Sequence, residues 1–225
     1  MHTTCFRSSS VRVPELRSGA VELSAPNAAA LAELLQVLTC GEESAALTFD
    51  HLAGACHERS LCSSLAGIAA DEREHQLLLA GLKASLPSPA VDHSLETSVR
   101  GFFLRLADRD VLVHFVRIVA IDSATCHILG ALRGRRRPLA QELRVSATFA
   151  RIHRDEARHV AIASRCATPL LKSVRGRDIA MDARERLIRV LQLRAGALDS
   201  LCVDPDQLFM RLRAMPRLAR RADAR

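Results

Sequence analysis

Two short segments, Glu72-Arg73-Glu74-His75 and Glu156-Ala157-Arg158-His159, share one spacing, in which a glutamate precedes a histidine by three residues. Three residues make nearly one turn of an α-helix, so the two side chains of each pair project from the same helix face. The sequence therefore predicts two helices that each turn one carboxylate and one imidazole in the same direction.

The composition favours helices around both segments. The chain has 225 residues, of which 3% are aromatic, and it contains no Trp and no Tyr. This length suits one domain with a substantial core, and the abundance of Ala, Leu and Arg favours helix over sheet. Without Tyr, the protein cannot store a tyrosyl radical.

Periodicity and Pro positions predict four long helices in two pairs. The expected ranges are 27–56, with Asn27 as N-cap, 60–85, 110–134 and 138–168. Turns within each pair are short, whereas residues 86–109, with a short helix at 102–106, form a long crossover. Further helices are expected at 182–201 and after Asp204-Pro205. The domain prediction is an arm (1–26), a bundle (27–168), C-terminal helices that pack on the bundle (169–215) and a basic tail (216–225).

In each long helix, polar residues interrupt an apolar stripe with alternating spacings of three and four. They are Glu42, then Glu72 with His75, then Asp122, then Glu156 with His159. Glu43 competes with Glu42, but it lies about 100° around the helix and off the stripe.

Four acids and two imidazoles at one level of a helical core would repel and lose solvation, at a cost of several kcal/mol for each carboxylate. Two divalent cations would neutralise them, and two such Glu-x-x-His pairs with two further acids form the ligand set of di-iron and di-manganese four-helix bundles. Oxygen and imidazole ligands suit iron, or manganese, better than structural zinc. The predicted metal ligands are Glu42, Glu72, His75, Asp122, Glu156 and His159.

Other polar residues near these positions leave alternatives open. His153 is either an extra ligand or, as we favour, a histidine at the rim. Asp71 and Asp155 precede the two ligand glutamates, and either could accept the outer N–H of a histidine from the neighbouring helix, or lie in solvent paired with Arg. Cys126 either lines a pocket or is a small buried side chain. Glu142 lies about 21 Å from Glu156 along the helix and is expected at the bundle end.

Seven cysteines without a CxxC motif indicate reduced thiols and a cytoplasmic protein. No uninterrupted apolar run reaches the roughly 18 residues of a membrane span, and the N-terminal residues lack the apolar h-region expected of a signal peptide. The net charge is +7, with Arg concentrated at 133–137 and 211–225. We interpret both runs as solvated, with an acidic partner as the alternative. Nucleic acid is not expected, because no aromatic side chains alternate with the arginines.

Across residues 28–168 the chain resembles the ferritin-like di-iron carboxylate superfamily. The similar segments are Gly41-Glu42-Glu43-Ser44-Ala45-Ala46-Leu47-Thr48-Phe49, Ile68-Ala69-Ala70-Asp71-Glu72-Arg73-Glu74-His75 and Ile152-His153-Arg154-Asp155-Glu156-Ala157-Arg158-His159. The last segment is similar to the oxygenase branches, such as the aminobenzoate N-oxygenase-like and aldehyde-deformylating-oxygenase-like proteins. The chain departs from the family pattern at Asp122, where Glu is usual, and in having no Tyr.

The resemblance implies an all-α, ferritin-like antiparallel four-helix bundle that binds two Fe ions and activates O2 to oxidise a small organic substrate, with an external electron donor. Glu72 and Glu156 would bridge the metals, His75 and His159 would be terminal ligands, and Glu42 and Asp122 would each cap one metal. The sequence leaves open whether the protein forms a homodimer.

The expected substrate pocket beside the metals is apolar, with Phe49, Phe115, Phe149 and Ile118 as its candidate lining. The alternative functions are a ferroxidase or peroxide-scavenging protein and a non-catalytic helical protein that binds a partner through its Arg-rich tail. The absence of a CxxC module disfavours the rubrerythrin form of the first alternative, and the positive net charge disfavours a storage cage.

Overall fold

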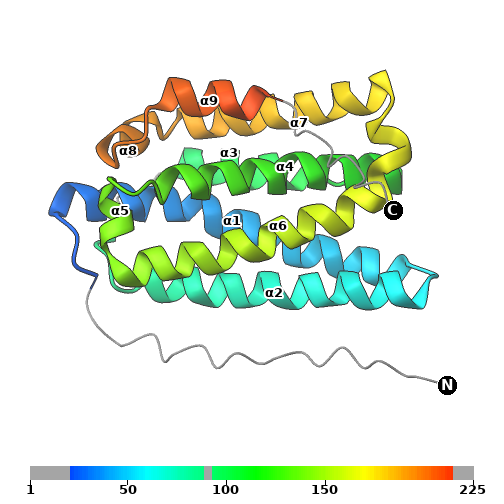
Figure 1. Ribbon diagram of the computed structural model, residues 1–225, viewed down its shortest axis with the longest axis horizontal. Helices are drawn as coiled ribbons and strands as arrows, with labels where there is room; N and C mark the ends of the chain where they lie inside the picture. The colour runs from blue at the N-terminus through cyan, green and yellow to red at the C-terminus, as the bar shows by residue number, and fades with distance from the viewer. Residues whose placement is uncertain (1–20, 89–92, 215–225) are drawn as a thin grey trace, which may run out of the picture.

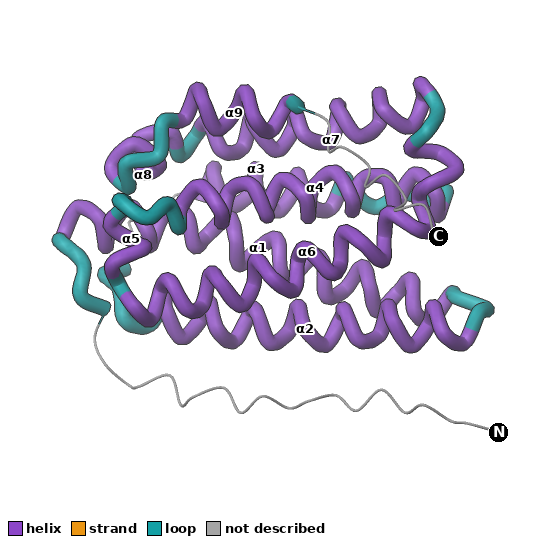
Figure 2. Tube along the Cα trace, viewed as in Figure 1, coloured by secondary structure: helices purple, strands orange, loops and turns teal. Residues whose placement is uncertain are grey.

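The computed structural model describes residues 21–88 and 93–214, and within these ranges every regular element is a helix (Figure 2). The helices are α1 (Ala25–Ala55), α2 (Arg59–Lys83), α3 (His93–Leu104), α4 (Val111–Leu132), α5 (Pro138–Gln141), α6 (Leu143–Leu171), α7 (Val174–Gln192), α8 (Ala195–Ser200) and α9 (Pro205–Arg213). The all-α prediction is confirmed. Most of the predicted arm and all of the predicted tail lie outside the described residues.

The long helices pack in pairs. α1 lies along α2, and α4 lies along α6, as the short turns within each pair predict, and α2 also contacts α6 (Figure 1). α3 belongs to the long crossover and contacts both α1 and α7. α7 and α9 cover the side of α4, and α8 packs against α1. The two Glu-x-x-His helices are therefore neighbours, and each has its own acid-bearing partner helix.

Local capping explains where several helices begin. The Asp110 side chain accepts hydrogen bonds from the backbone N–H groups of Leu112 and Val113 at the start of α4. Glu142 accepts from the Val145 N–H at the start of α6. Each cap satisfies N–H groups that have no partner within the helix. Glu142 thus lies at the bundle end, as expected from its distance along the helix.

Several predicted boundaries were wrong. The first helix, α1, begins at Ala25 after Ser24, so Asn27 lies inside it and is not its N-cap. The crossover helix is α3, which begins at His93, and Pro138 starts the separate short helix α5 before α6 begins. α6 continues through Pro169 to Leu171, because a Pro in the last turn removes only one hydrogen bond. Helix α7 begins at Val174, where Ser173 caps it, and the predicted 182–201 helix divides into α7 and α8.

A buried arginine ties the C-terminal helices to α4. Arg184 in α7 is 1% exposed. Its guanidinium donates to the Ala120 carbonyl at 3.1 Å, the Ser123 hydroxyl at 2.7 Å and the Leu212 carbonyl at 2.9 Å, and also to the Ala214 carbonyl. Burial lowers the pKa of Arg184 to about 10, so the group is still charged at neutral pH. Sequence reasoning missed this residue, since a single Arg in an amphipathic helix gives no signal of burial.

Helix α4 is the one described helix that is long and apolar enough to cross a membrane. Arg117 and Asp122 interrupt its apolar residues, so the sequence shows no uninterrupted apolar run there, but the mean hydropathy of an 18-residue stretch of α4 is 1.5. Of that stretch, 67% is buried inside the protein. α6, α7 and α9 cover it, so α4 is a core helix of this fold.

Candidate metal centre

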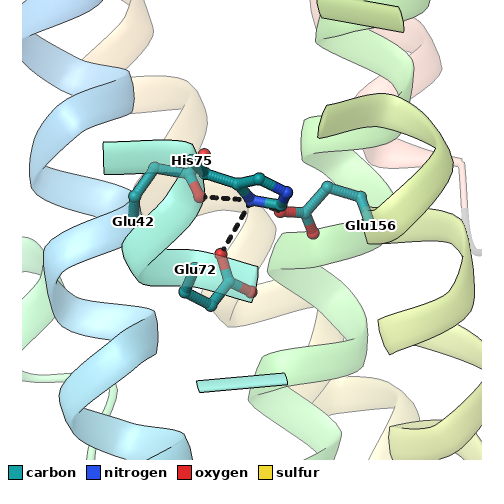
Figure 3. Close-up of side chains that lie close together, drawn as sticks. All are labelled: Glu42, Glu72, His75 and Glu156. Carbon is teal, nitrogen blue, oxygen red and sulfur yellow. Dashed lines mark hydrogen bonds and ion pairs between the residues drawn. The ribbon is translucent and has the colours of Figure 1, made fainter. Parts of the chain in front are cut away.

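The six predicted ligands all lie in the interior, on α1, α2, α4 and α6. Their exposed fractions run from 0% for His75 and His159 to 8% for Asp122. Ligand atoms of four of them lie within 4.8 Å of one another; these are Glu42, Glu72, His75 and Glu156. Figure 3 shows their side chains converging from three helices.

Within this cluster, the Nδ1 atom of His75 faces the three carboxylates. Nδ1 lies 3.0 Å from Glu42 Oε2 and 3.2 Å from Glu72 Oε2. Glu156 Oε1 lies 3.9 Å from the same nitrogen. One imidazole nitrogen thus faces carboxylate oxygens from three helices, which is the donor set that a hard divalent cation takes.

The remaining two predicted ligands, His159 and Asp122, lie beside this four-residue cluster rather than within it. His159 Nδ1 lies 2.9 Å from Glu72 Oε1, so the two oxygens of Glu72 face different histidines. His159 Nδ1 and Glu72 Oε1 face each other as an ion pair without the alignment of a hydrogen bond, and Asp122 Oδ2 is buried with no partner among the described residues. Buried polar atoms are nearly always paired, so the unpartnered oxygen of Asp122 is unusual. A metal ion would fit here, because it would bind this oxygen together with His159 Nδ1 and Glu72 Oε1.

Charges of the cluster act strongly on one another. Burial raises the pKa of Glu42 to about 8, although His75 opposes the change, and burial together with the Glu72 charge raises the pKa of Asp122 to about 8. Burial and the charges of Glu72 and Asp122 raise the pKa of Glu156 well above its ordinary value. Several acids therefore hold protons at neutral pH, and a divalent cation would displace them.

In contrast, the pKa values of Glu72 and of the two histidines are displaced so that their charged forms are favoured. Burial alone would raise the pKa of Glu72, but contacts with His159 and His75 lower it to about 2. Burial alone would lower the pKa of His75, but contacts with Asp155, Glu42 and Glu72 raise it to about 11. The corresponding contacts with Asp71 and Glu72 raise the pKa of His159 to about 9. Glu72 thus remains ionised between two imidazolium rings.

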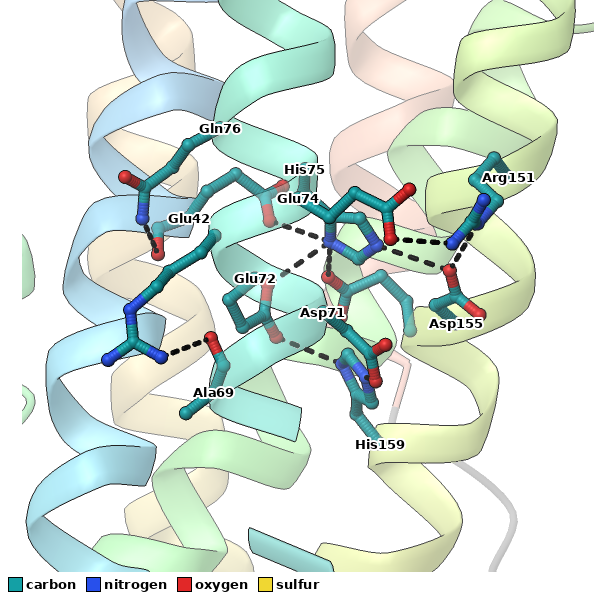
Figure 4. A network of polar contacts seen from close by, with 12 residues as sticks. Glu42, Ala69, Asp71, Glu72, Glu74, His75, Gln76, Arg151, Asp155 and His159 are labelled. Atoms are coloured by element: carbon teal, nitrogen blue, oxygen red, sulfur yellow. Dashed lines mark hydrogen bonds and ion pairs between the residues drawn. The ribbon is translucent and has the colours of Figure 1, made fainter. Parts of the chain in front are cut away.

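Each histidine is held from outside by an aspartate on the opposite helix. His75 Nε2 in α2 lies 3.4 Å from Asp155 Oδ2 in α6, and His159 Nε2 in α6 lies 3.3 Å from Asp71 Oδ2 in α2 (Figure 4). Arg158 lies beside both carboxylates, 2.7 Å from Asp71 and 3.2 Å from Asp155. Both sequence-based alternatives are thus combined, because each aspartate contacts a histidine of the neighbouring helix and is also paired with Arg. The crossed contacts direct both Nδ1 atoms inward.

The structure also separates the other candidates. Glu43 is exposed, and its carboxylate points toward Arg100 at 4.0 Å, so Glu42 is the acid that α1 places in the cluster. The ring of His153 lies 3.4 Å from Arg133, outside the cluster. Cys126 is partly buried, and burial together with the Asp122 charge raises its thiol pKa to about 11.

A mainly apolar cavity reaches the carboxylates from the side of α1 and α4. Including the part open to solvent, its volume is about 920 Å3, and Glu42, Glu72, Asp122 and Glu156 form part of its wall. Of the four apolar residues predicted to line a pocket, Phe49 and Ile118 do so. Phe115 instead lines a second hollow near Glu58, and Phe149 is fully buried in the core. Helix phase cannot distinguish a pocket wall from plain core, because both present apolar side chains inward.

Comparisons with known proteins give no family for this chain. No protein-family model matches it, and no curated protein or solved structure shows significant similarity. The functional argument therefore depends on the geometry of the cluster and cavity alone.

Proposed function

We propose that the protein is a ferritin-like di-metal carboxylate enzyme that binds two Fe ions, or Mn, and uses O2 to oxidise a small organic substrate. The observation that supports this most strongly is the buried cluster of Glu42, Glu72, His75 and Glu156, whose ligand atoms lie within 4.8 Å of one another, with the unpartnered Asp122 Oδ2 beside it. A helical core without metal would pair these groups or replace them with apolar side chains.

In this proposal the six ligands divide into two sets that share Glu72 and Glu156. Glu72 turns one oxygen toward each histidine, as a bridging carboxylate would. His75 with Glu42 would complete one set, and His159 with Asp122 the other. Two metals so held would supply redox chemistry for O2, while the protein fixes their positions and excludes water.

Chain residues around the metals would manage protons and ligand orientation. Asp155 and Asp71 hold the outer Nε2 atoms of His75 and His159, so each ring keeps its Nδ1 directed at the centre. Because Glu42 and Asp122 have raised pKa values, they hold protons in the metal-free protein and would release them on metal binding.

The cavity favours an organic substrate over iron oxidation or peroxide removal, because neither of those reactions needs an apolar space beside the metals. An apolar cavity that ends at the carboxylates would instead admit a molecule with a sizeable hydrocarbon part. The electron donor, the cytoplasmic location and the oligomeric state remain predictions from the sequence.

The first test is metal content. We expect about two irons per chain by elemental analysis after anaerobic loading with Fe(II), and a transient optical absorption when O2 is admitted. Glu72→Gln should lose most of the metal, whereas Glu43→Gln, which changes the exposed neighbour of Glu42, should retain it. Absence of stoichiometric iron or manganese from the folded wild-type protein would refute the proposal and favour a non-catalytic helical protein.

A further inference from the structure

Three of the cysteines that the structure describes gather at the end of the bundle that holds the turn between α1 and α2 (Figure 1). Cys56 follows the last residue of α1, Cys62 lies in the first turn of α2, and Cys166 lies in the last turns of α6. From Cys62 to Glu72, α2 advances about 15 Å at 1.5 Å per residue. These thiols are therefore separate from the carboxylate cluster, and the proposed function does not use them.

The backbone carbonyl of Glu58 brings the first two thiols together. Its oxygen accepts a hydrogen bond from the Cys62 backbone N–H at 2.9 Å and another from the Cys56 thiol at 3.4 Å. The Cys56 sulfur therefore lies against the first turn of α2. There the Cys62 thiol donates to the Cys56 side chain, and this contact, with burial and the Cys56 charge, raises the pKa of Cys62. Both cysteines are partly exposed, so a reagent in solution can reach them.

A hollow opens beside this pair, and Glu58, Arg165 and Cys166 form part of its wall. Including the part open to solvent, its volume is about 1080 Å3. Burial raises the pKa of the Cys166 thiol, the Arg165 charge opposes this, and the charges of Cys56 and Glu58 raise it further. The hollow thus gives a small molecule space to approach the pair, and it places a third thiol near Cys56.

We propose that Cys56 and Cys62 are a reversible redox pair, which forms an intramolecular disulfide by exchange with a low-molecular-weight disulfide. Bridging requires two cysteines whose side chains already lie close together and face each other, and the contact across this short turn meets that requirement. In a reducing compartment such a disulfide is usually transient, and it serves catalysis or redox sensing. The pair does not depend on the proposed metal centre.

The exchange takes two steps and needs no other oxidant. The Cys56 thiolate attacks one sulfur of the small disulfide, which forms a mixed disulfide and releases one small thiol that carries away the Cys56 proton. The Cys62 sulfur then attacks the Cys56 sulfur and releases a second small thiol with the Cys62 proton. Two protein thiols are oxidised and one small disulfide is reduced. Cys56 attacks first, because the hydrogen bond donated by Cys62 stabilises negative charge on the Cys56 sulfur.

The experiment uses the full chain, reduced, freed of reductant and chelated, with glutathione disulfide as the probe and without O2. Remaining thiols are then blocked with N-ethylmaleimide. Trypsin cleaves after Arg59, between the two cysteines, so their disulfide joins two peptides that are otherwise separate. Mass spectrometry detects the joined peptides, and fragment ions distinguish Cys56 from Cys40, which lies on the same peptide. We expect the Cys56–Cys62 link in most chains.

Serine variants test the order of attack. Cys62→Ser should retain glutathione on Cys56 at least about tenfold more than Cys56→Ser retains it on Cys62, because the resolving sulfur is then missing. Cys202→Ser, which removes an exposed thiol between α8 and α9, is the control and should form the joined peptides as the wild type does. A circular dichroism melt of each variant checks that it is folded.

Three results would overturn the proposal. The first is that Cys56 and Cys62 stay unlinked under conditions in which the exposed Cys202 has fully reacted with glutathione disulfide. The second is a disulfide that joins Cys56 to Cys166, since the third thiol would then be the partner. The third is equal glutathione retention in both serine variants, which would contradict the order of attack. Iron loading is measured separately on Cys62→Ser and should match the wild type, so neither proposal depends on the outcome of the other.

Discussion

Replacing Asp122 by Asn should stabilise the metal-free protein at alkaline pH while it weakens metal binding. Asp122 is buried, its Oδ2 atom has no partner, and its pKa rises from 3.8 to about 8. The folded state therefore holds a proton that the unfolded state has released. Because the folded state binds more protons, the free energy of unfolding falls as pH rises from about 4 to about 8.

The size of the effect follows from this change in pKa. Each pKa unit corresponds to about 1.4 kcal/mol, so the increase to about 8 sets an upper limit of about 6 kcal/mol on the destabilisation at pH 8 and above. The amide of Asn is neutral and nearly the same size, but its buried N–H group would lack a partner, at a cost of about 1–3 kcal/mol. We expect a net gain of about 1–3 kcal/mol at pH 8.

The assay is urea unfolding followed by circular dichroism, on chelated wild-type and D122N protein at pH 5 and pH 8. The difference between them should be small at pH 5 and should favour D122N at pH 8. Added Fe(II), under anaerobic conditions, should stabilise the wild type more than D122N. The reasoning would be refuted if D122N were the less stable protein at pH 8 without metal, since Asp122 would then have a favourable partner inside the protein.

Four further substitutions test three other features of the structure. Asp155→Asn and Asp71→Asn should each weaken metal binding about 10- to 100-fold in a chelator competition, because each removes the acceptor that orients a histidine; the exposed Asp182→Asn is the control, and equal losses in all three would contradict this role. Arg184→Met should lower the free energy of unfolding by about 3 kcal/mol or more in urea, since buried acceptors lose their charged donor; an unchanged midpoint would show that water replaces the guanidinium. Gly176→Ala should destabilise by at least about 1–3 kcal/mol, because the added Cβ would lie 2.0 Å from the Leu170 carbonyl oxygen; a melting temperature equal to that of the wild type would refute this contact.

The sequence predicted the all-α class, the four long helices and their pairing, because apolar periodicity and Pro positions act locally. It also predicted that Glu42 rather than Glu43 faces inward, since only Glu42 shares the phase of the apolar stripe. The crossed contacts from Asp155 to His75 and from Asp71 to His159 follow from the same logic applied to two neighbouring helices. The metal-ligand role of the six predicted residues stays a prediction.

Features that depend on packing between distant segments could not be read from the sequence. Arg184 is buried because carbonyls from α4 and from the end of α9 meet at one point, which no local pattern encodes. Likewise, Arg117 lines the cavity because the turn after α3 reaches α4. The start of α7 at Val174 depends on a single serine cap, Ser173, which was overlooked beside the stronger Pro169 signal.

The crossed aspartates give the centre a mechanical property. Helix α2 supplies His75 and the support for His159, whereas α6 supplies His159 and the support for His75. A shift of α2 along α6 would therefore misalign both rings at once, and a metal that locks one ring also fixes the helix spacing that the other ring needs. In the proposed di-metal centre the two metal positions would thereby be coupled, so loading of the first should favour the second and the centre should fill cooperatively.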